Sequence, residues 1–199
     1  MNLASSDKKN YGRAIWGPPL WHLIHKISYG LPENLPISDQ QLLMKYFSTL
    51  VYLIPCPYCA HHFQSAMNIK KFSKSLATRQ SVIAWFRSQH NEINEANKKR
   101  VLTDMEIDAL HKNTVFDYKS FHFLINYLYK RVVSGHINRT VFIHWFLMTF
   151  KIFPCPVWKS FAINYFLTND IEQNRQLDDH VVKTWLDHFF QGVGMPAIS

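Results

Sequence analysis

The chain has 199 residues, a length that suits one large domain or two small ones. Hydrophobic residues make up 47% of it and charged residues only 18%, which predicts a folded globular protein with a large buried core. The net charge of +8 is spread over short groups of lysine and arginine rather than a basic tract, so we do not expect nucleic-acid binding. Three cysteines are too few for a disulfide scaffold.

Residues 1–12 form a polar N-terminal tail with no apolar stretch like that of a signal peptide. The most apolar run, 141–153, contains His144 and Lys151 and is too short to span a bilayer. We therefore expect a soluble protein that is made in the cytosol and has no membrane span.

Apolar residues recur with helical spacing through the first half. Residues 38–41 (Ser-Asp-Gln-Gln) are expected to supply a capping-box-like start for a helix. Thr78 is placed to cap a later helix, and residues 103–106 (Thr-Asp-Met-Glu) are expected to open another. Pro55 is expected to end a helix. Residues 16–19 (Trp-Gly-Pro-Pro) are expected to lead into a first helix that ends at Gly30. We then predict helices over 42–54, 56–72 and 81–99, and a shorter fifth that begins at Thr103.

The second half has the same helical spacing, and we predict helices over 118–133, 139–153, 158–167 and 180–190. No segment alternates with period two, so the predicted fold class is all-α. Residues 153–156 (Phe-Pro-Cys-Pro) echo residues 54–57 (Ile-Pro-Cys-Pro), which indicates a degenerate repeat. Trp158 stands where the second cysteine of the repeat would be, so the repeat has lost any redox site.

Cys56 and Cys59 are the residues with the clearest chemistry. Two thiols at this spacing on the first turn of a helix can close a redox disulfide, and the helix N-terminus lowers the pKa of a thiol. Two other interpretations stay open at this point. The pair could be half of a zinc site completed by Cys155 or histidines, or two inert buried cysteines.

Two further sets carry flat polar or aromatic side chains. Trp21 and His25 share one helical face, as do His90 and Asn94, with Asn91 beside them. Such groups suit an aromatic heterocycle with hydrogen-bonding edges, although a solvated surface or a core position explains each set when it is taken alone.

Taken in order, these pieces resemble the Erv/ALR family of FAD-dependent sulfhydryl oxidases, especially members encoded by large DNA viruses. The resemblance covers about residues 12–100 and rests on an ordered set of motifs. They are Gly12-Arg13, Trp21-x-x-x-His25, Pro55-Cys56-x-x-Cys59-x-x-His62-Phe63, and Trp85 followed by His90-Asn91-x-Ile93-Asn94 and Lys99.

The resemblance implies a bundle of four helices plus a short fifth over 13–112, which holds FAD without a covalent bond. It also implies a homodimer built from the first helices, and a degenerate Erv-like module without a redox site over 113–199. The cofactor-binding residues carried over by position are Arg13, Trp21, His25, Cys59, His62, Trp85, His90, Asn91, Asn94 and Lys99. Of these, Arg13 and Lys99 are expected to face the phosphates.

The resemblance further implies a mechanism in which a substrate dithiol attacks Cys56, the more accessible sulfur. Cys59 passes two electrons to FAD, and molecular oxygen takes them up as hydrogen peroxide. The expected partners are protein dithiols or a thioredoxin-like relay protein. A viral member would act in the host cytoplasm or nucleus, or in the virion.

The chain departs from the family pattern at Arg87, where many relatives carry a further cysteine, and residues 1–12 lack a relay cysteine. Two rival functions remain. A glutaredoxin-like exchanger also carries Cys-Pro-Tyr-Cys but needs strands after it, and a zinc-binding interaction module would be non-catalytic.

Overall fold

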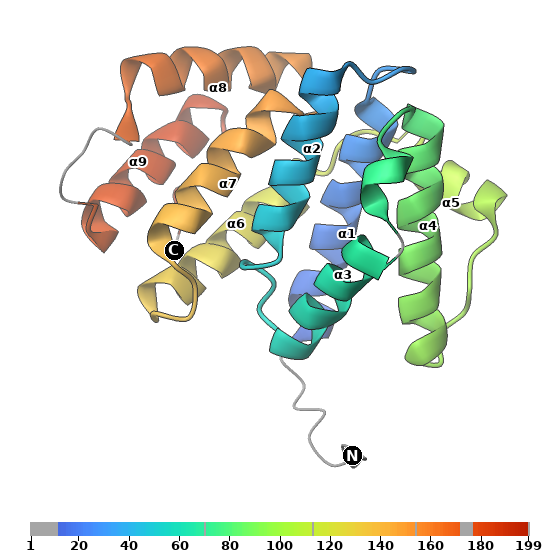
Figure 1. The fold of residues 1–199 in the computed structure, drawn as a ribbon. Coiled ribbons are helices and arrows are strands. Elements are labelled where there is room, and N and C mark those ends of the chain that lie inside the picture. The colour runs from blue at the N-terminus through green and yellow to red at the C-terminus, as the bar shows by residue number, and fades with distance from the viewer. Residues whose placement is uncertain (1–11, 70, 113, 154, 172–176, 199) are drawn as a thin grey trace.

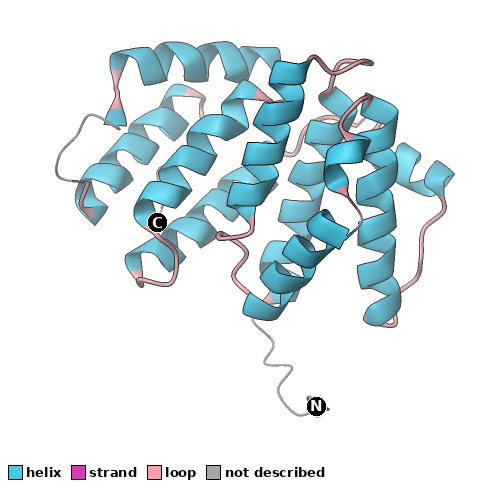
Figure 2. Cartoon of the chain, viewed as in Figure 1, coloured by secondary structure: helices cyan, strands magenta, loops and turns pink. Residues whose placement is uncertain are grey.

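The computed structural model describes residues 12–69, 71–112, 114–153, 155–171 and 177–198. In this part of the chain the secondary structure is helical throughout (Figure 1 and Figure 2), which confirms the all-α prediction. The expected polar tail lies outside the described residues apart from Gly12. The helices are α1 (Arg13–Gly30), α2 (Ile37–Leu50), α3 (Pro57–Ile69), the short 3-10 helix η1 (Phe72–Ser75), α4 (Arg79–Ala96), α5 (Asp104–His111), α6 (Tyr118–Val133), α7 (Arg139–Lys151), α8 (Pro156–Thr168) and α9 (Asp179–Gly192).

The predicted helix starts at Thr78 and Thr103 are confirmed, whereas the capping-box-like start at residues 38–41 is wrong, because α2 begins at Ile37 and these residues lie inside it. The Thr78 hydroxyl accepts a hydrogen bond from the backbone of Ser81, and the Thr103 hydroxyl accepts one from the backbone of Glu106. In both helices the side chain of the third helical residue also accepts a hydrogen bond from the backbone N–H of the capping residue. Two backbone donors that have no partner within the helix are thereby satisfied.

The start of α1 differs from the prediction. Pro18 and Pro19 lie inside the helix rather than ahead of it, and α1 begins at Arg13. They are the sixth and seventh residues of α1, so each removes one intrahelical hydrogen bond, to the carbonyls of Ala14 and Ile15. Gly12 precedes the helix with φ of 68°, a left-handed conformation that favours glycine.

The two halves of the chain repeat the same order of elements. Helices α1 to α4 are followed by α5, and helices α6 to α9 then recur with similar lengths. Across the boundary α1 packs against α6 and α2 against α7, as Figure 1 shows. Helices α1 and α2 therefore each meet their own counterpart, which is the pattern of an isologous, two-fold interface within one chain.

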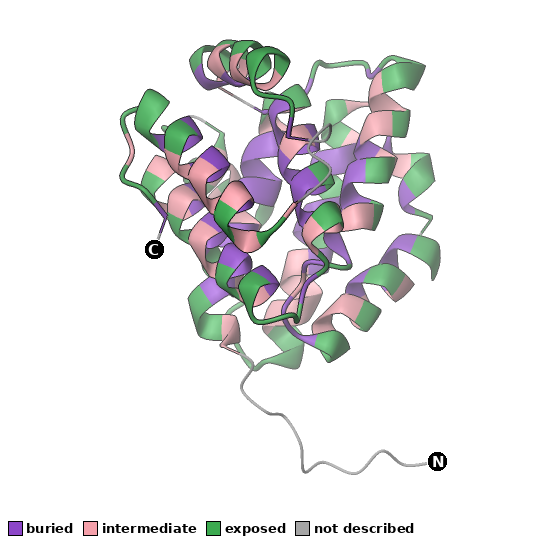
Figure 3. Ribbon diagram, turned by 90° about the vertical axis from the view of Figure 1, so that its left-hand side faces the viewer, coloured by how far each residue is buried: buried purple, intermediate pink, exposed green. Residues whose placement is uncertain are grey.

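One continuous core joins the halves. Tyr46 of α2 stacks on Trp145 of α7 with ring centroids 5.6 Å apart, and both rings are fully buried. Figure 3 shows buried positions gathered between the helices. Helices α6 and α7 thus cover the first helices that the family resemblance assigns to a homodimer. A homodimer through that face would require the second half to move aside, and one through another surface stays a prediction.

Candidate redox and cofactor site

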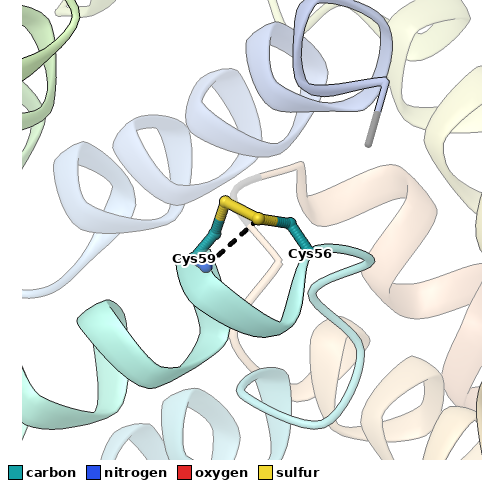
Figure 4. Close-up of a disulfide and its surroundings, with 2 residues drawn as sticks. All are labelled: Cys56 and Cys59. Atoms are coloured by element: carbon teal, nitrogen blue, oxygen red, sulfur yellow. Dashed lines mark hydrogen bonds between the residues drawn. A yellow bond between two sulfur atoms is a disulfide. The ribbon is translucent and has the colours of Figure 1, made fainter. Parts of the chain in front are cut away.

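The predicted redox pair forms a disulfide at the start of α3. Cys56 lies on the segment leading into the helix and Cys59 lies on its first turn, with Cα atoms 5.1 Å apart (Figure 4). The backbone N–H of Cys59 donates a hydrogen bond to Cys56 Sγ at 3.2 Å. A thiolate at Cys56 would gain both this bond and the field of the helix N-terminus, which favour the charged form.

The expectation that Cys56 is the more accessible sulfur is wrong for this structure. Cys56 is 2% exposed and belongs to the hydrophobic core, whereas Cys59 is partly exposed. The physical reason is position: Cys56 ends a turn that packs inward after Leu53, while Cys59 lies on the helix surface. The apolar neighbours of Cys56 could not be inferred from the motif.

The structure brings together three of the predicted planar side chains. Trp21 and His90 stack with ring centroids 4.2 Å apart and an interplanar angle of 2°. His25 Nε2 lies 3.0 Å from His90 Nδ1, so one ring nitrogen donates to the other. Since Trp21 and His25 lie on α1 and His90 on α4, the packing of these two helices creates the group. We call Trp21, His25 and His90 the ring cluster.

Burial keeps the ring cluster uncharged near neutral pH. Burial lowers the pKa of His25 to about 2, and the neighbouring His111 and His90 add to the effect. Burial also lowers the pKa of His90 to about 4, with a further contribution from the charge of Lys99. The cluster therefore presents neutral, flat surfaces, which suit stacking and hydrogen bonding to a neutral heterocycle better than binding an anion.

Two residues that the sequence did not single out extend the cluster. His111 of α5 stacks on His25 with centroids 4.4 Å apart, and burial lowers its pKa to about 4. Lys26 is buried and its Nζ donates to the backbone carbonyls of His111 (2.9 Å) and Thr114. Nothing in the sequence indicated His111, because its stacking on His25 depends on how α5 packs against α1.

Other predicted residues are placed differently. Trp85 is buried and packs on Phe72 and Phe63, with centroids 4.6 and 6.3 Å away, so it belongs to the core behind the cluster. The Asn91 amide donates to the carbonyl of Leu102 (2.7 Å) and accepts from its N–H (3.1 Å). Asn91 therefore fixes the loop after α4.

The remaining predicted residues are half-buried or exposed and are not part of the core. His62 lies on α3, one turn after Cys59, and Asn94 lies on α4, one turn after His90; both are half-buried. The backbone N–H of Lys99 donates to the carbonyl of Asn94 at 2.8 Å. Arg13 is the first residue of α1 and is also half-buried.

Arg87, the position where relatives carry a cysteine, has taken over a structural function. Its guanidinium is 6% exposed, forms an ion pair with Asp108 and contacts Asp104 at 3.4 Å. It also donates to the Tyr29 hydroxyl at 2.8 Å, which joins α4 to α5 and α1.

The first half of the chain matches a known protein family. Residues 18–114 match the model of the Erv1 / Alr family. These residues form an Erv1/Alr domain. The domain contains the disulfide, the ring cluster, Asn91 and Lys99, whereas Arg13 precedes it. The second half of the chain lies outside the match.

Two relatives of the Erv1/Alr domain have names that describe an activity. The chain is 27% identical over 99 residues to a probable FAD-linked sulfhydryl oxidase of Acanthamoeba polyphaga mimivirus, covering 49% of this chain and 69% of that protein. It is 27% identical over 103 residues to an FAD-linked sulfhydryl oxidase of Saccharomyces cerevisiae, covering 51% of this chain and about half (49%) of the yeast protein. No solved structure matches the chain significantly.

Two further observations concern all the residues that the structure describes. No helix in the described ranges has the length and apolarity needed to cross a membrane. Among those same residues, His, Cys, Asp and Glu side chains nowhere gather in threes that could hold a metal ion.

Proposed function

We propose that this chain is an FAD-linked sulfhydryl oxidase that forms disulfides in protein substrates and reduces molecular oxygen to hydrogen peroxide. The observation that carries the proposal is the Cys56–Cys59 disulfide at the N-terminus of α3, inside an Erv1/Alr domain. The names of two relatives, one viral and one from yeast, support the same activity.

The residues near the disulfide fit a planar cofactor. The ring cluster offers flat aromatic surfaces, and His25 Nδ1 is buried with no hydrogen-bond partner among the described residues. In the proposal Trp21, His25, His62, His90 and Asn94 line the FAD site, and Arg13 and Lys99 face its phosphates, because a cation pairs well with phosphate oxygens. Trp85 supports the site from the core, and Asn91 acts by fixing the loop that follows Lys99.

Cys59 is assigned to the flavin side of the pair. It lies one turn before Phe63, whose ring meets Trp85 of α4, so this face of α3 turns toward the helix that carries His90. When bound, FAD accepts two electrons from the reduced cysteine pair and transfers them to molecular oxygen.

The chain's own residues carry out the thiol chemistry in two exchanges. A substrate thiolate attacks Cys56 Sγ, the Cys56–Cys59 bond breaks, and Cys59 leaves as a thiolate. The second substrate thiolate then attacks the substrate sulfur of the mixed disulfide, which oxidises the substrate. Cys56 leaves as a thiolate next to the Cys59 N–H, the donor that stabilises the negative charge.

Because Cys56 is buried, the proposal requires the segment 51–57 to move before a substrate can reach it. Tyr52 within this segment and Tyr58 directly after it are 67% and 71% exposed, so part of the segment already lies at the surface. Direct protein dithiols or a thioredoxin-like relay protein are the proposed electron donors. The proposed location is the host cytoplasm or nucleus, or the virion of a virus that encodes the chain.

We further propose that the chain contains two modules, an oxidase domain over 13–112 and a degenerate Erv-like module over 113–199. The repeated helix order and the pairing of α1 with α6 and α2 with α7 support this division. In the second module, Trp158 packs on Tyr118 at the position of the missing cysteine, with ring centroids 4.5 Å apart. Its proposed role is to cover α1 and α2.

The decisive experiment measures oxygen consumption by purified protein with dithiothreitol as the donor. Wild-type protein should be yellow with bound flavin and consume oxygen, whereas Cys59→Ala should keep the flavin and lose nearly all activity. Wild-type protein that carries FAD yet consumes no oxygen would contradict the proposal.

The rival functions give different results in the same preparation. Glutathione-dependent reduction without flavin would favour a glutaredoxin-like exchanger, and colourless protein with stoichiometric zinc would favour an interaction module. The helices found throughout the described ranges argue against the first rival, whose fold needs strands after the motif. The disulfide argues against the second, because zinc binds cysteines as separate thiolates.

A further inference from the structure

Gln89 on α4 has a buried amide that the fold leaves unused. The residue is 2% exposed, and neither its Nε2 nor its Oε1 has a hydrogen-bond partner among the described residues. A buried amide without partners is costly, so natural proteins rarely keep one without a function. Leucine or methionine would fill the same volume in a core without that cost.

Other buried polar side chains near the site do have partners. The Ser28 hydroxyl donates to the carbonyl of Ile24 at 2.8 Å, and the Lys26 ammonium donates to the carbonyl of His111 at 2.9 Å. The Arg87 guanidinium binds Tyr29 and Asp108. Gln89 differs from these residues because neither of its polar atoms has a partner, whereas in Arg87 only Nε lacks one.

Helix geometry indicates where the Gln89 side chain points. With about 100° of rotation per residue, Gln89 lies about 40° from Trp85 and about 100° from His90 around the axis of α4. Trp85 faces α3, where it meets Phe63, and His90 faces α1, where it stacks on Trp21. Gln89 therefore points into the wedge between α1 and α3, on the face of α3 that carries Cys59.

Trp85 supplies a second polar atom of the same kind on this side of α4. Its Nε1 is buried and has no hydrogen-bond partner in the described part of the chain. Trp85 and Gln89 lie one turn apart, yet the indole N–H does not donate to the Gln89 oxygen. Together with His25 Nδ1 of α1, these are buried donors and acceptors that the described residues leave without partners.

We propose that Gln89 contacts the flavin directly and fixes its orientation in the site. A primary amide carries one donor group and one acceptor, and the pyrimidine edge of a flavin carries an N–H between two carbonyl groups. The two edges are complementary, so the amide can donate to a flavin carbonyl and accept from the flavin N–H. This inference rests on the proposed oxidase function and adds a residue outside the motifs that carry the family resemblance.

The test compares Gln89→Leu with Gln80→Leu, a control on the same helix whose side chain is exposed. FAD affinity is measured by titrating flavin-free protein and following the quenching of flavin fluorescence. We expect Gln89→Leu to weaken FAD binding about 10- to 100-fold, as the loss of two hydrogen bonds predicts, and to change the visible spectrum of the bound flavin. Gln80→Leu should leave both unchanged.

A second measurement separates a role in cofactor binding from a role in folding. In the absence of FAD, Gln89→Leu should unfold at the same temperature as wild type or higher, because it removes an unpaired buried amide. The inference would be overturned if Gln89→Leu kept the FAD affinity and the visible spectrum of wild type. It would also be overturned if the substitution lowered the unfolding temperature of the flavin-free protein as much as that of the FAD-bound protein. If Gln89→Leu does not fold, Gln89→Met replaces it.

Failure of the inference and failure of the proposed function give different results. If wild-type protein does not bind FAD, both are wrong. If wild type binds FAD and consumes oxygen while Gln89→Leu binds FAD equally well, only the inference is wrong.

Discussion

His25 shows how burial determines the chemistry of a single side chain in this protein. It is fully buried, stacks between His90 and His111, and shares a hydrogen bond with His90. Its pKa is lowered to about 2, mainly by burial. Two of the three histidines were identified by the sequence, but their mutual contact follows only from the packing of α1, α4 and α5.

The first prediction concerns the pH dependence of stability. Unfolded histidine has a pKa of 6.5, and the folded values of His25, His90 and His111 are lowered to about 2, 4 and 4. The unfolded chain therefore binds more protons below pH 6.5, so the stabilisation is fully present above that pH and is lost as the pH falls. Urea unfolding of flavin-free protein should show a declining free energy of unfolding from pH 6.5 to about 5, above the range in which carboxylates titrate.

His111→Gln provides the matched comparison. It removes one of the three protonatable rings, so the decline over this pH interval should become shallower than in wild type. A wild-type free energy of unfolding that stays flat between pH 6.5 and 5 would contradict the buried, neutral state of the cluster.

The second prediction concerns Cys155, which accepts a hydrogen bond from the Tyr118 hydroxyl at 2.8 Å. Cys155→Ala should keep flavin binding and oxygen consumption within about two-fold of wild type, because Cys155 belongs to the half without a cysteine pair. The lost contact should lower the free energy of unfolding by about 1 kcal/mol. A large loss of activity in a stably folded Cys155→Ala protein would mean that the second half takes part in electron transfer.

Sequence reasoning succeeded at the residue scale where local spacing carries the information. The Cys56–Cys59 pair and the positions of Trp21, His25 and His90 follow from motifs and helical periodicity. It failed for the burial of Cys56 and for His111, Lys26 and Gln89, because each depends on contacts between elements far apart in the chain. No local pattern shows which side of α4 will face the wedge between α1 and α3.

At the scale of elements, α5 is held against the rest of the domain by Arg87. The buried guanidinium joins Asp108 of α5, Tyr29 of α1 and the chain of α4. Because α5 also carries His111, this ion pair supports the ring cluster from behind.

The third prediction compares the two partners of this ion pair. Asp108→Asn leaves the 6% exposed guanidinium without its main counter-charge and should cost about 1–3 kcal/mol of stability. Arg87→Met leaves a carboxylate that is 39% exposed and can be solvated, so it should cost less, below about 1 kcal/mol. Chemical unfolding of both variants and of the double variant gives the comparison. A greater loss for Arg87→Met would contradict the assignment of the guanidinium as the buried partner.

Helix boundaries were predictable where a side chain caps the helix. Thr78 and Thr103 mark the starts of α4 and α5, and the structure confirms both. The predicted start of α2 at residues 38–41 was wrong, because the helix begins after Pro36, which gives no side-chain cap; α2 therefore runs from Ile37 to Leu50 instead of from 42 to 54. The short η1 was also missed, since four residues give no periodic signal.

At the scale of the molecule, the two halves pack through equivalent helices. The echo at Cys155 predicted a repeat, but only the structure shows α1 against α6 and α2 against α7. A sequence pattern gives the apolar face of each helix and cannot say whether a second chain or a second half of the same chain covers it. In this protein the covering partner is internal, and the core runs without interruption from one half to the other.

The last prediction tests that continuity. Tyr46 of α2 is fully buried against Trp145 of α7, so Tyr46→Ala should open a cavity and cost about 3–5 kcal/mol. Urea unfolding can be followed by flavin release from the first half and by the near-UV circular dichroism, to which Trp158 and Trp185 of the second half contribute. Since the halves share one core, the substitution should lower the urea midpoints of both signals together. We expect the two signals to change at the same urea concentration in wild type, and likewise in Tyr46→Ala. If Tyr46→Ala lost its flavin while the near-UV signal stayed at wild-type midpoint, the halves would fold independently, and the internal two-fold interface would be weaker than its buried aromatic pair implies.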